Sequence, residues 1–95
     1  MKNEFKVGGY VLSTAGHDRG EYYVILQLDD EYAYLVDGRI RTLNRPKKKK
    51  QKHITALVDT DQVLVDKVIQ QTVKNEEIKR SIKLLKYSKS NKEVT

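Results

Sequence analysis

The densest group of chemically capable side chains in this sequence is a basic stretch between residues 39 and 52. Eight of its residues are Lys or Arg and none is Asp or Glu, so it carries +8 in a chain of net charge +6. Lys meets an anion as a point charge, whereas Arg can hold a phosphate through two parallel hydrogen bonds. Such a block favours a polyanionic partner. The alternative is a solvated loop that keeps a small protein soluble.

A second group lies between residues 16 and 20. Gly16 and Gly20 flank His17, Asp18 and Arg19, and strand-forming runs lie on both sides. Glycine adopts backbone conformations that cost other residues free energy, so this spacing predicts a tight loop. Its amides, with His17 and Arg19 as side-chain donors, can contact a phosphate backbone. A structural hairpin turn without a ligand is an equally good interpretation.

No set of residues in the sequence indicates catalysis. The chain has no cysteine, which excludes disulfides and Cys-ligated zinc. It lacks H-E-x-x-H, G-x-S-x-G and P-loop motifs, and its two histidines, His17 and His53, are far apart. We interpret the acidic run 29–31 as a turn, not as a cation site. We therefore expect no enzyme, no metal, no cofactor and no small-molecule substrate.

Short strands in the first half must position these groups. Strand-like runs separated by turn signals are expected at residues 7–15, 22–28, 32–36, 39–43 and 52–57. Asp37-Gly38 predicts a two-residue hairpin turn, after which Arg39 and Arg41 share one face of a strand. Pro46 is expected to end that strand, and Lys47–Lys50 to form a mobile loop. About five short strands predict a small barrel filled by its own side chains.

The second half changes to a helical period. Apolar residues from Leu64 to Val73 predict a first helix capped by Asp59 or Asp61, although a strand over Val63–Val65 stays possible. Asn75, followed by two acidic residues, predicts the start of a second helix.

This second helix carries two stripes. The apolar stripe of Ile78, Ile82 and Leu85 is expected to pack on the barrel. The basic stripe of Lys79, Lys83 and Lys86 either stays solvated or extends the anion-binding surface. The predicted organisation is a barrel over residues 1–58 with a basic loop at 44–52, a helical segment at 59–87, and a flexible tail at 88–95.

Two segments together resemble a known family. Gly9-Tyr10-Val11-Leu12, the 16–20 loop and Tyr23-Val24-Ile25 are similar to the KOW motif of SH3-like barrels in ribosomal and transcription-elongation proteins. Tyr34-Leu35-Val36-Asp37-Gly38 and the basic run after it resemble archaeal and eukaryotic large-subunit ribosomal proteins of the "fourteen-e" type. The resemblance covers roughly residues 6–57. It implies an SH3-like barrel, and ribosomal RNA as the partner.

The resemblance and the charge pattern together give a set of candidate contacts. The KOW loop role would fall on Gly16, His17, Arg19 and Gly20. One departure is that Asp18 and Glu21 make this loop less basic than many RNA-binding KOW loops, which favours contact through residues 39–52. The candidate RNA-binding side chains are His17, Arg19, Arg39, Arg41, Arg45, Lys47, Lys48, Lys49, Lys50 and Lys52.

The resulting expectation is a non-catalytic, cytoplasmic protein that binds structured ribosomal RNA or the ribosome, with ribosomal proteins as further partners. The sequence shows no signal peptide and no membrane span. Of the tyrosines, Tyr10 and Tyr32 are the best candidates to be free and stack unpaired bases, although positions in the core or at its rim are the favoured interpretation. The rival interpretations are an SH3-like protein-interaction module of the translation or transcription machinery, and non-specific DNA binding.

Overall fold

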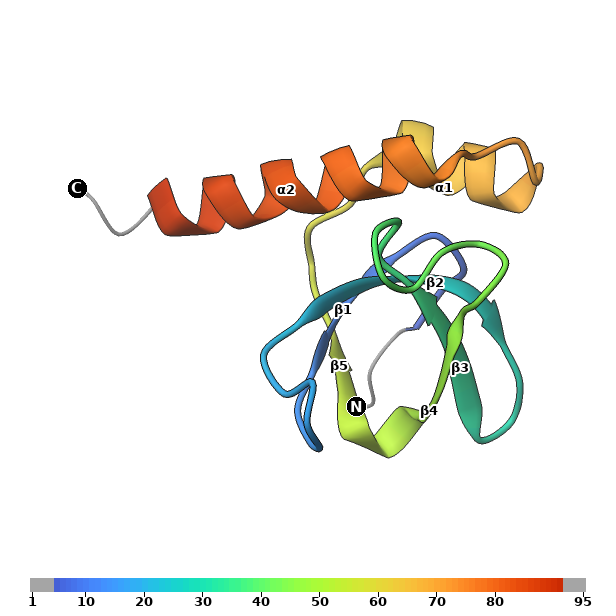
Figure 1. Ribbon diagram of the computed structural model, residues 1–95, viewed down its shortest axis with the longest axis vertical. Helices are drawn as coiled ribbons and strands as arrows, with labels where there is room; N and C mark the ends of the chain where they lie inside the picture. Colours follow the sequence, from blue (N-terminus) through green and yellow to red (C-terminus); the bar gives the residue numbers. More distant parts are fainter. Residues whose placement is uncertain (1–4, 92–95) are drawn as a thin grey trace.

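The computed structural model describes residues 5–91, which form five strands followed by two α-helices (Figure 1). The strands are β1 (Tyr10–Ser13), β2 (Tyr22–Leu28), β3 (Tyr32–Val36), β4 (Lys47–Lys50) and β5 (Ile54–Ala56). A 3₁₀ turn at Gln51–His53 joins β4 to β5, and the helices are α1 (Gln62–Ile69) and α2 (Asn75–Asn91). The predicted class, mainly β with C-terminal helices, is confirmed.

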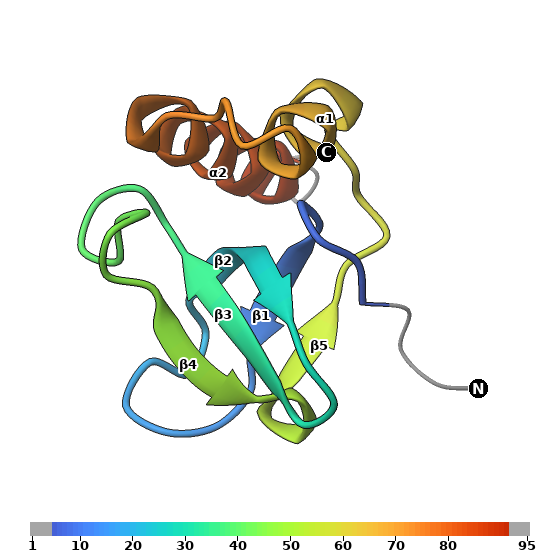
Figure 2. The same ribbon diagram turned by 90° about the vertical axis from the view of Figure 1, so that its right-hand side faces the viewer.

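The strands form one antiparallel sheet in the order β4-β3-β2-β1-β5. A register shift between Ile25 and Gln27 interrupts the pairing of β2 with β3, and such bulges increase the bend of a strand. The sheet curls into a barrel-like shape, consistent with the expected SH3-like fold, but it does not close because β4 and β5 do not pair (Figure 2).

Alternating side chains give the sheet two buried faces. The inner face holds Val11, Tyr23, Ile25, Ala33, Leu35 and Ile54. On the outer face, Tyr10, Val24 and Val36 pack against α1 and α2, which lie across the sheet (Figures 1 and 2). The predicted apolar stripe of Ile78, Ile82 and Leu85 is buried in this second layer, which confirms that α2 packs on the barrel.

Polar contacts fix the helices to the sheet. The Asp61 carboxylate accepts a hydrogen bond from the Leu64 amide at 3.1 Å and caps α1, as predicted. Val63–Val65 is therefore helical, and the strand alternative is wrong. The Tyr10 hydroxyl hydrogen-bonds to Ser81 Oγ, which donates to Asp61 Oδ2 at 3.2 Å. This chain of hydrogen bonds connects β1, α2 and the start of α1.

The predicted flexible tail is wrong in its first part. Helix α2 continues through Ser88–Ser90 and ends at Asn91. Lys89 on this last turn forms an ion pair with Asp59 at 2.8 Å, which holds the end of α2 against the segment before α1. Residues 92–95 lie outside the described part of the chain.

The segment between β3 and β4 differs most from the prediction. Residues 39–43 form a loop because Asp37 Oδ1 accepts hydrogen bonds from the amides of Arg39, Ile40 and Arg41 at 2.9, 3.0 and 2.9 Å. These amides are thereby unavailable for a ladder with β3. The prediction that Arg39 and Arg41 lie on one strand face is therefore wrong.

The partner of β3 is instead the lysine run, which was predicted to be a mobile loop. Leu35 pairs with Lys47 and Tyr32 with Lys50. Pro46 directly precedes this strand instead of ending one, and at that position its missing amide hydrogen removes no ladder hydrogen bond.

Candidate nucleic-acid interface

The four lysines of β4 are divided between two faces, because neighbouring side chains on a strand point to opposite sides. Lys47 and Lys49 stand opposite Leu35 and Ala33, whose side chains fill the barrel interior. Lys48 and Lys50 stand opposite Tyr34 and Tyr32 on the outer face. The lysine run is therefore not one continuous basic patch.

Lys49 is held inside a polar cluster at the end of the barrel. Its ammonium donates to Asp18 Oδ1 at 3.0 Å and to the Ala15 carbonyl at 2.9 Å, and its side chain is only 9% exposed. Ser13 Oγ donates to Asp18 Oδ1, and the Tyr23 hydroxyl donates to Asp18 Oδ2, each at 2.9 Å. Lys49 was a candidate RNA contact, but its charge is used to fix the 16–20 loop to β4.

The pKa of Asp18 reflects this cluster. Burial alone would raise the pKa, but hydrogen bonds from Lys49, Tyr23 and Ser13 outweigh burial and lower the pKa from 3.8 to about 2. Burial and the neighbouring Asp18 carboxylate raise the pKa of the Tyr23 hydroxyl. Asp18 therefore stays charged and paired throughout the neutral range.

The glycine loop and the Asp37–Arg41 loop meet around a surface cleft of about 280 Å³, here called the loop cleft. Its basic lining consists of His17, Arg39, Arg41 and Lys47. Lys47 also lies 3.9 Å from Asp18, with its side chain 28% exposed. Four of the candidate RNA-binding residues, from three segments, are thus brought together.

A second cleft of about 300 Å³, here called the helix cleft, shares Arg39, Glu21 and Asp37 with the loop cleft. Its other wall is α2, with Lys79, Lys83 and Lys86. The lysine stripe therefore faces the loops of the barrel. The two clefts, which together we call the basic surface, contain six Lys and Arg residues against three carboxylates.

Of the remaining candidates, Arg19, Arg45 and Lys52 are exposed but line neither cleft. On the outer face of the sheet, Lys48 lies over the Tyr32 ring at 4.4 Å from its centre. Lys50 lies 3.6 Å from Glu31. The spacing of the lysines in the sequence is enough to predict a basic stripe on α2. It does not show that this stripe faces the loops of the barrel.

The tyrosines follow the core or rim alternative. Tyr10 is buried and hydrogen-bonded to Ser81, so it is not free to stack a base. Tyr32 is only partly exposed. Because the lysine run is ordered and lies beside Tyr32 and Tyr34, the arrangement that would favour a pure protein-docking surface, with the lysines disordered and remote, is not observed.

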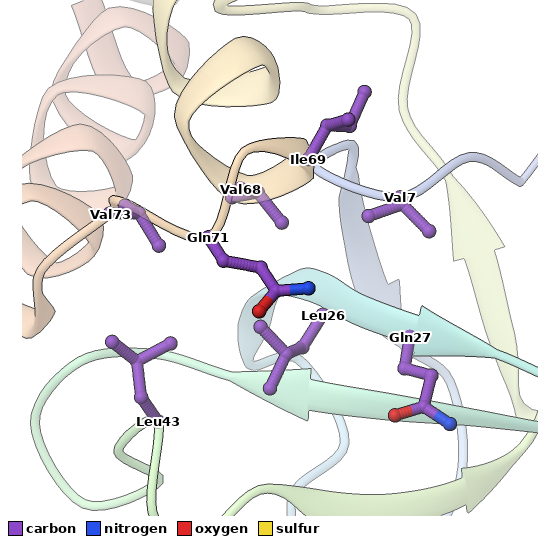
Figure 3. A pocket seen from close by; sticks show the side chains of 8 residues that line it. All are labelled: Val7, Leu26, Gln27, Leu43, Val68, Ile69, Gln71 and Val73. Carbon is purple, nitrogen blue, oxygen red and sulfur yellow. The ribbon is translucent and has the colours of Figure 1, made fainter.

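A larger apolar cleft of about 680 Å³ lies where α1 and the turn after it meet the outer face of β2 (Figure 3). Leu26, Leu43, Val68 and Val73 contribute to it, and the Gln71 side chain points across it toward Leu26. Gln71 has a backbone φ of 61°, in the left-handed region. This cleft contains no Lys, Arg, Asp or Glu and is separate from the basic surface.

Within residues 5–91, no group of three or more His, Cys, Asp or Glu side chains is placed to hold a metal ion. Neither of the helices in that part of the chain has the length and apolar character needed to cross a membrane. Comparison of the chain with protein-family models and with curated proteins found no match.

Proposed function

We propose that this protein is a non-catalytic RNA-binding protein of the cytoplasm and that it binds structured RNA, with ribosomal RNA the favoured target. The observation that carries the proposal is the convergence of Arg39, Arg41 and Lys47 with the α2 lysines on one surface. The resemblance of the 16–20 loop and the Asp37-Gly38 segment to KOW-type ribosomal proteins supports RNA as the polyanion.

In this proposal, binding is electrostatic docking on the phosphate backbone. Asp37 positions the two arginines, because its carboxylate fixes the backbone that carries them. Arg39 and Arg41 then grip phosphates through paired hydrogen bonds, and Lys47 adds a point charge. Asp18 supports this arrangement by holding β4 against the glycine loop. Contacts of this kind select the shape of an RNA more than its sequence.

Fluorescence anisotropy with a structured RNA tests the proposal. If about six phosphates are neutralised, affinity should fall roughly a thousandfold between 50 and 200 mM salt. The variant Arg39→Ala/Arg41→Ala should reduce the slope of log K against log salt by about 2. The control Arg45→Ala/Lys52→Ala removes the same charge from exposed positions outside both clefts, and we expect it to change the slope much less.

Absence of binding to any RNA at low salt would refute RNA binding. Equal losses in the two variants would show that diffuse charge, not the basic surface, carries the affinity. Duplex DNA at matched salt is the further comparison, and equal affinity for DNA would favour the non-specific DNA interpretation.

The apolar cleft between α1 and β2 favours a second candidate function, a protein-interaction module of the translation or transcription machinery. Its Leu26, Leu43 and Val68 side chains offer an apolar contact. This candidate and RNA binding use different surfaces. A protein that binds no RNA in the experiment above would make protein docking the preferred function.

A further inference from the structure

The helix cleft combines basic side chains with an apolar surface, which a site that binds only phosphate would not need. Its floor includes Ile82, which is 5% exposed, and one wall is the half-buried ring of Tyr22, which packs against the core under α2. Arg39, Lys83 and Lys86 lie around this apolar floor. An apolar floor surrounded by cations suits a ligand that combines a flat, weakly polar ring with an anionic group. A nucleotide is such a ligand.

The lysine stripe matches the spacing of phosphates along a strand. Lys79, Lys83 and Lys86 are four and three residues apart, so they share one face of α2. They span roughly 10 Å along the helix axis. Phosphates of a paired strand advance about 3.4 Å each along the duplex axis and those of an unpaired strand lie farther apart, so the stripe is long enough to contact more than one consecutive phosphate. Within residues 5–91, Lys83 and Lys86 form no ion pair, and Lys79 has only a 3.9 Å contact with exposed Glu76.

Two carboxylates at the junction with the loop cleft limit where phosphates can sit. Glu21 and Asp37 border both clefts and repel a phosphate placed between them. The Glu21 carboxylate can accept a hydrogen bond from the amino group of a base or from a ribose 2′-hydroxyl, whereas Asp37 Oδ1 already accepts from three backbone amides. The phosphates therefore belong beside the α2 lysines, with the base directed toward the floor.

We infer that the helix cleft takes one unpaired nucleotide of a structured RNA, with the flanking phosphates on Lys79, Lys83 and Lys86. The cleft lies between the Asp37–Arg41 loop and α2, and its volume of about 300 Å³ suits one nucleotide and is too small for a double helix. This inference rests on the proposed RNA-binding function and specifies its ligand as a bulge or internal loop.

The test compares an RNA duplex that contains a central bulge with the same duplex fully paired. The wild-type protein should bind the bulged duplex roughly tenfold more tightly, as expected for one stacked base. Lys83→Ala/Lys86→Ala should lose most of this preference and reduce the salt slope by about 1.5. The matched control is Lys74→Ala/Arg80→Ala, because both residues are exposed and line neither part of the basic surface. This control should keep the preference.

Tyr22→Leu separates stacking from charge. It keeps an apolar wall but removes the ring, so the bulge preference should fall while the salt slope stays unchanged. Equal wild-type affinity for the two duplexes, or a loss on both duplexes that the control variant reproduces, would overturn the inference while leaving RNA binding intact. No binding to either duplex at low salt would overturn the proposed function itself.

Discussion

The carboxylate of Asp18 accepts hydrogen bonds from Ser13, Tyr23 and Lys49, which belong to β1, β2 and β4. It therefore connects the edge strand β4 with β1 and β2, which are not its neighbours in the sheet. From the sequence alone, Asp18 between Gly16 and Gly20 only makes the loop less suited to bind a nucleic acid, because its charge repels phosphates. In the structure, the same residue fixes β4, the strand that contributes Lys47 to the loop cleft.

The paired state of Asp18 makes stability depend on pH in the acid range. Its folded pKa, about 2, is lower than the usual 3.8, so its contribution is fully present above about pH 4 and is lost as pH falls toward 2. From this pKa shift, we expect Asp18→Asn to lower the free energy of unfolding at pH 7 by about 2 kcal/mol. It should also show a shallower loss of stability between pH 4 and pH 2. Urea denaturation at several pH values measures both effects.

The control for this experiment is Asp30→Asn, which removes an exposed carboxylate from the turn between β2 and β3. We expect its acid profile to follow that of the wild type. An unchanged profile in Asp18→Asn would mean that the cluster with Lys49 does not stabilise the fold.

At the scale of elements, the loop between β3 and β4 and the start of α2 are packed against each other. Gly38 has a backbone φ of 79°, and a Cβ atom at this position would lie 2.3 Å from the Asn75 carbonyl oxygen and 2.7 Å from the Lys79 amide. The Leu43 amide donates to Asn75 Oδ1 at 2.8 Å. The Asn75 side chain thus holds this loop, and the loop sets the width of the helix cleft.

Gly38→Ala should therefore destabilise the protein by more than the cost of placing an alanine at a positive φ, because the new Cβ would also clash with α2. Gly20→Ala is the matched control, because Gly20 has a φ of 92° but no atom within 4 Å of an added Cβ. The control should lose about 1–2 kcal/mol of unfolding free energy. Gly38→Ala should lose more, because α2 must also move, and thermal unfolding of both variants gives the comparison. Equal losses would show that the contact with α2 is not tight.

The sequence was sufficient to predict the elements whose signals are local. Residues 22–28 and 32–36 alternate as strands, Asp61 caps a helix, and Ile78, Ile82 and Leu85 define a buried stripe. It failed between residues 37 and 50, because one Asp37 oxygen binds three amides and because Lys49 has a partner 31 residues away. The same holds for the candidate site. The sequence predicted its arginines, but the position of Arg39 beside the α2 lysines depends on tertiary packing.

The whole molecule consists of two apolar layers that share the sheet. The inner layer lies within the curled sheet, whereas the outer layer, with Tyr10, Val24 and Val36, is covered by α1 and α2, with Val7, Leu43 and Leu57 packed beside them. Ile78 is completely buried in this outer layer. The helices are therefore part of the folding unit, and half of the basic surface depends on them.

A chain ending at residue 60 should lose cooperative unfolding, because three buried sheet residues would be exposed to water. A chain ending at residue 91 keeps both helices and should unfold like the 95-residue chain. Near-ultraviolet circular dichroism of the tyrosines, followed through heating, distinguishes the two. A sharp transition in the shorter chain would show that the barrel folds alone.

Among residues 5–91, strand β4 pairs with β3 on one side and with no strand on the other, so it is an edge strand of the sheet that a second copy of the chain could approach. Edge strands of this kind are templates for aggregation, and lysines are a frequent protection against it. Lys49 is buried against Asp18, but Lys47, Lys48 and Lys50 on this edge are at least partly exposed and therefore disfavour pairing with another copy whether or not RNA is present. The basic run that indicates a nucleic-acid partner would thus also hinder strands of other copies from adding to the sheet.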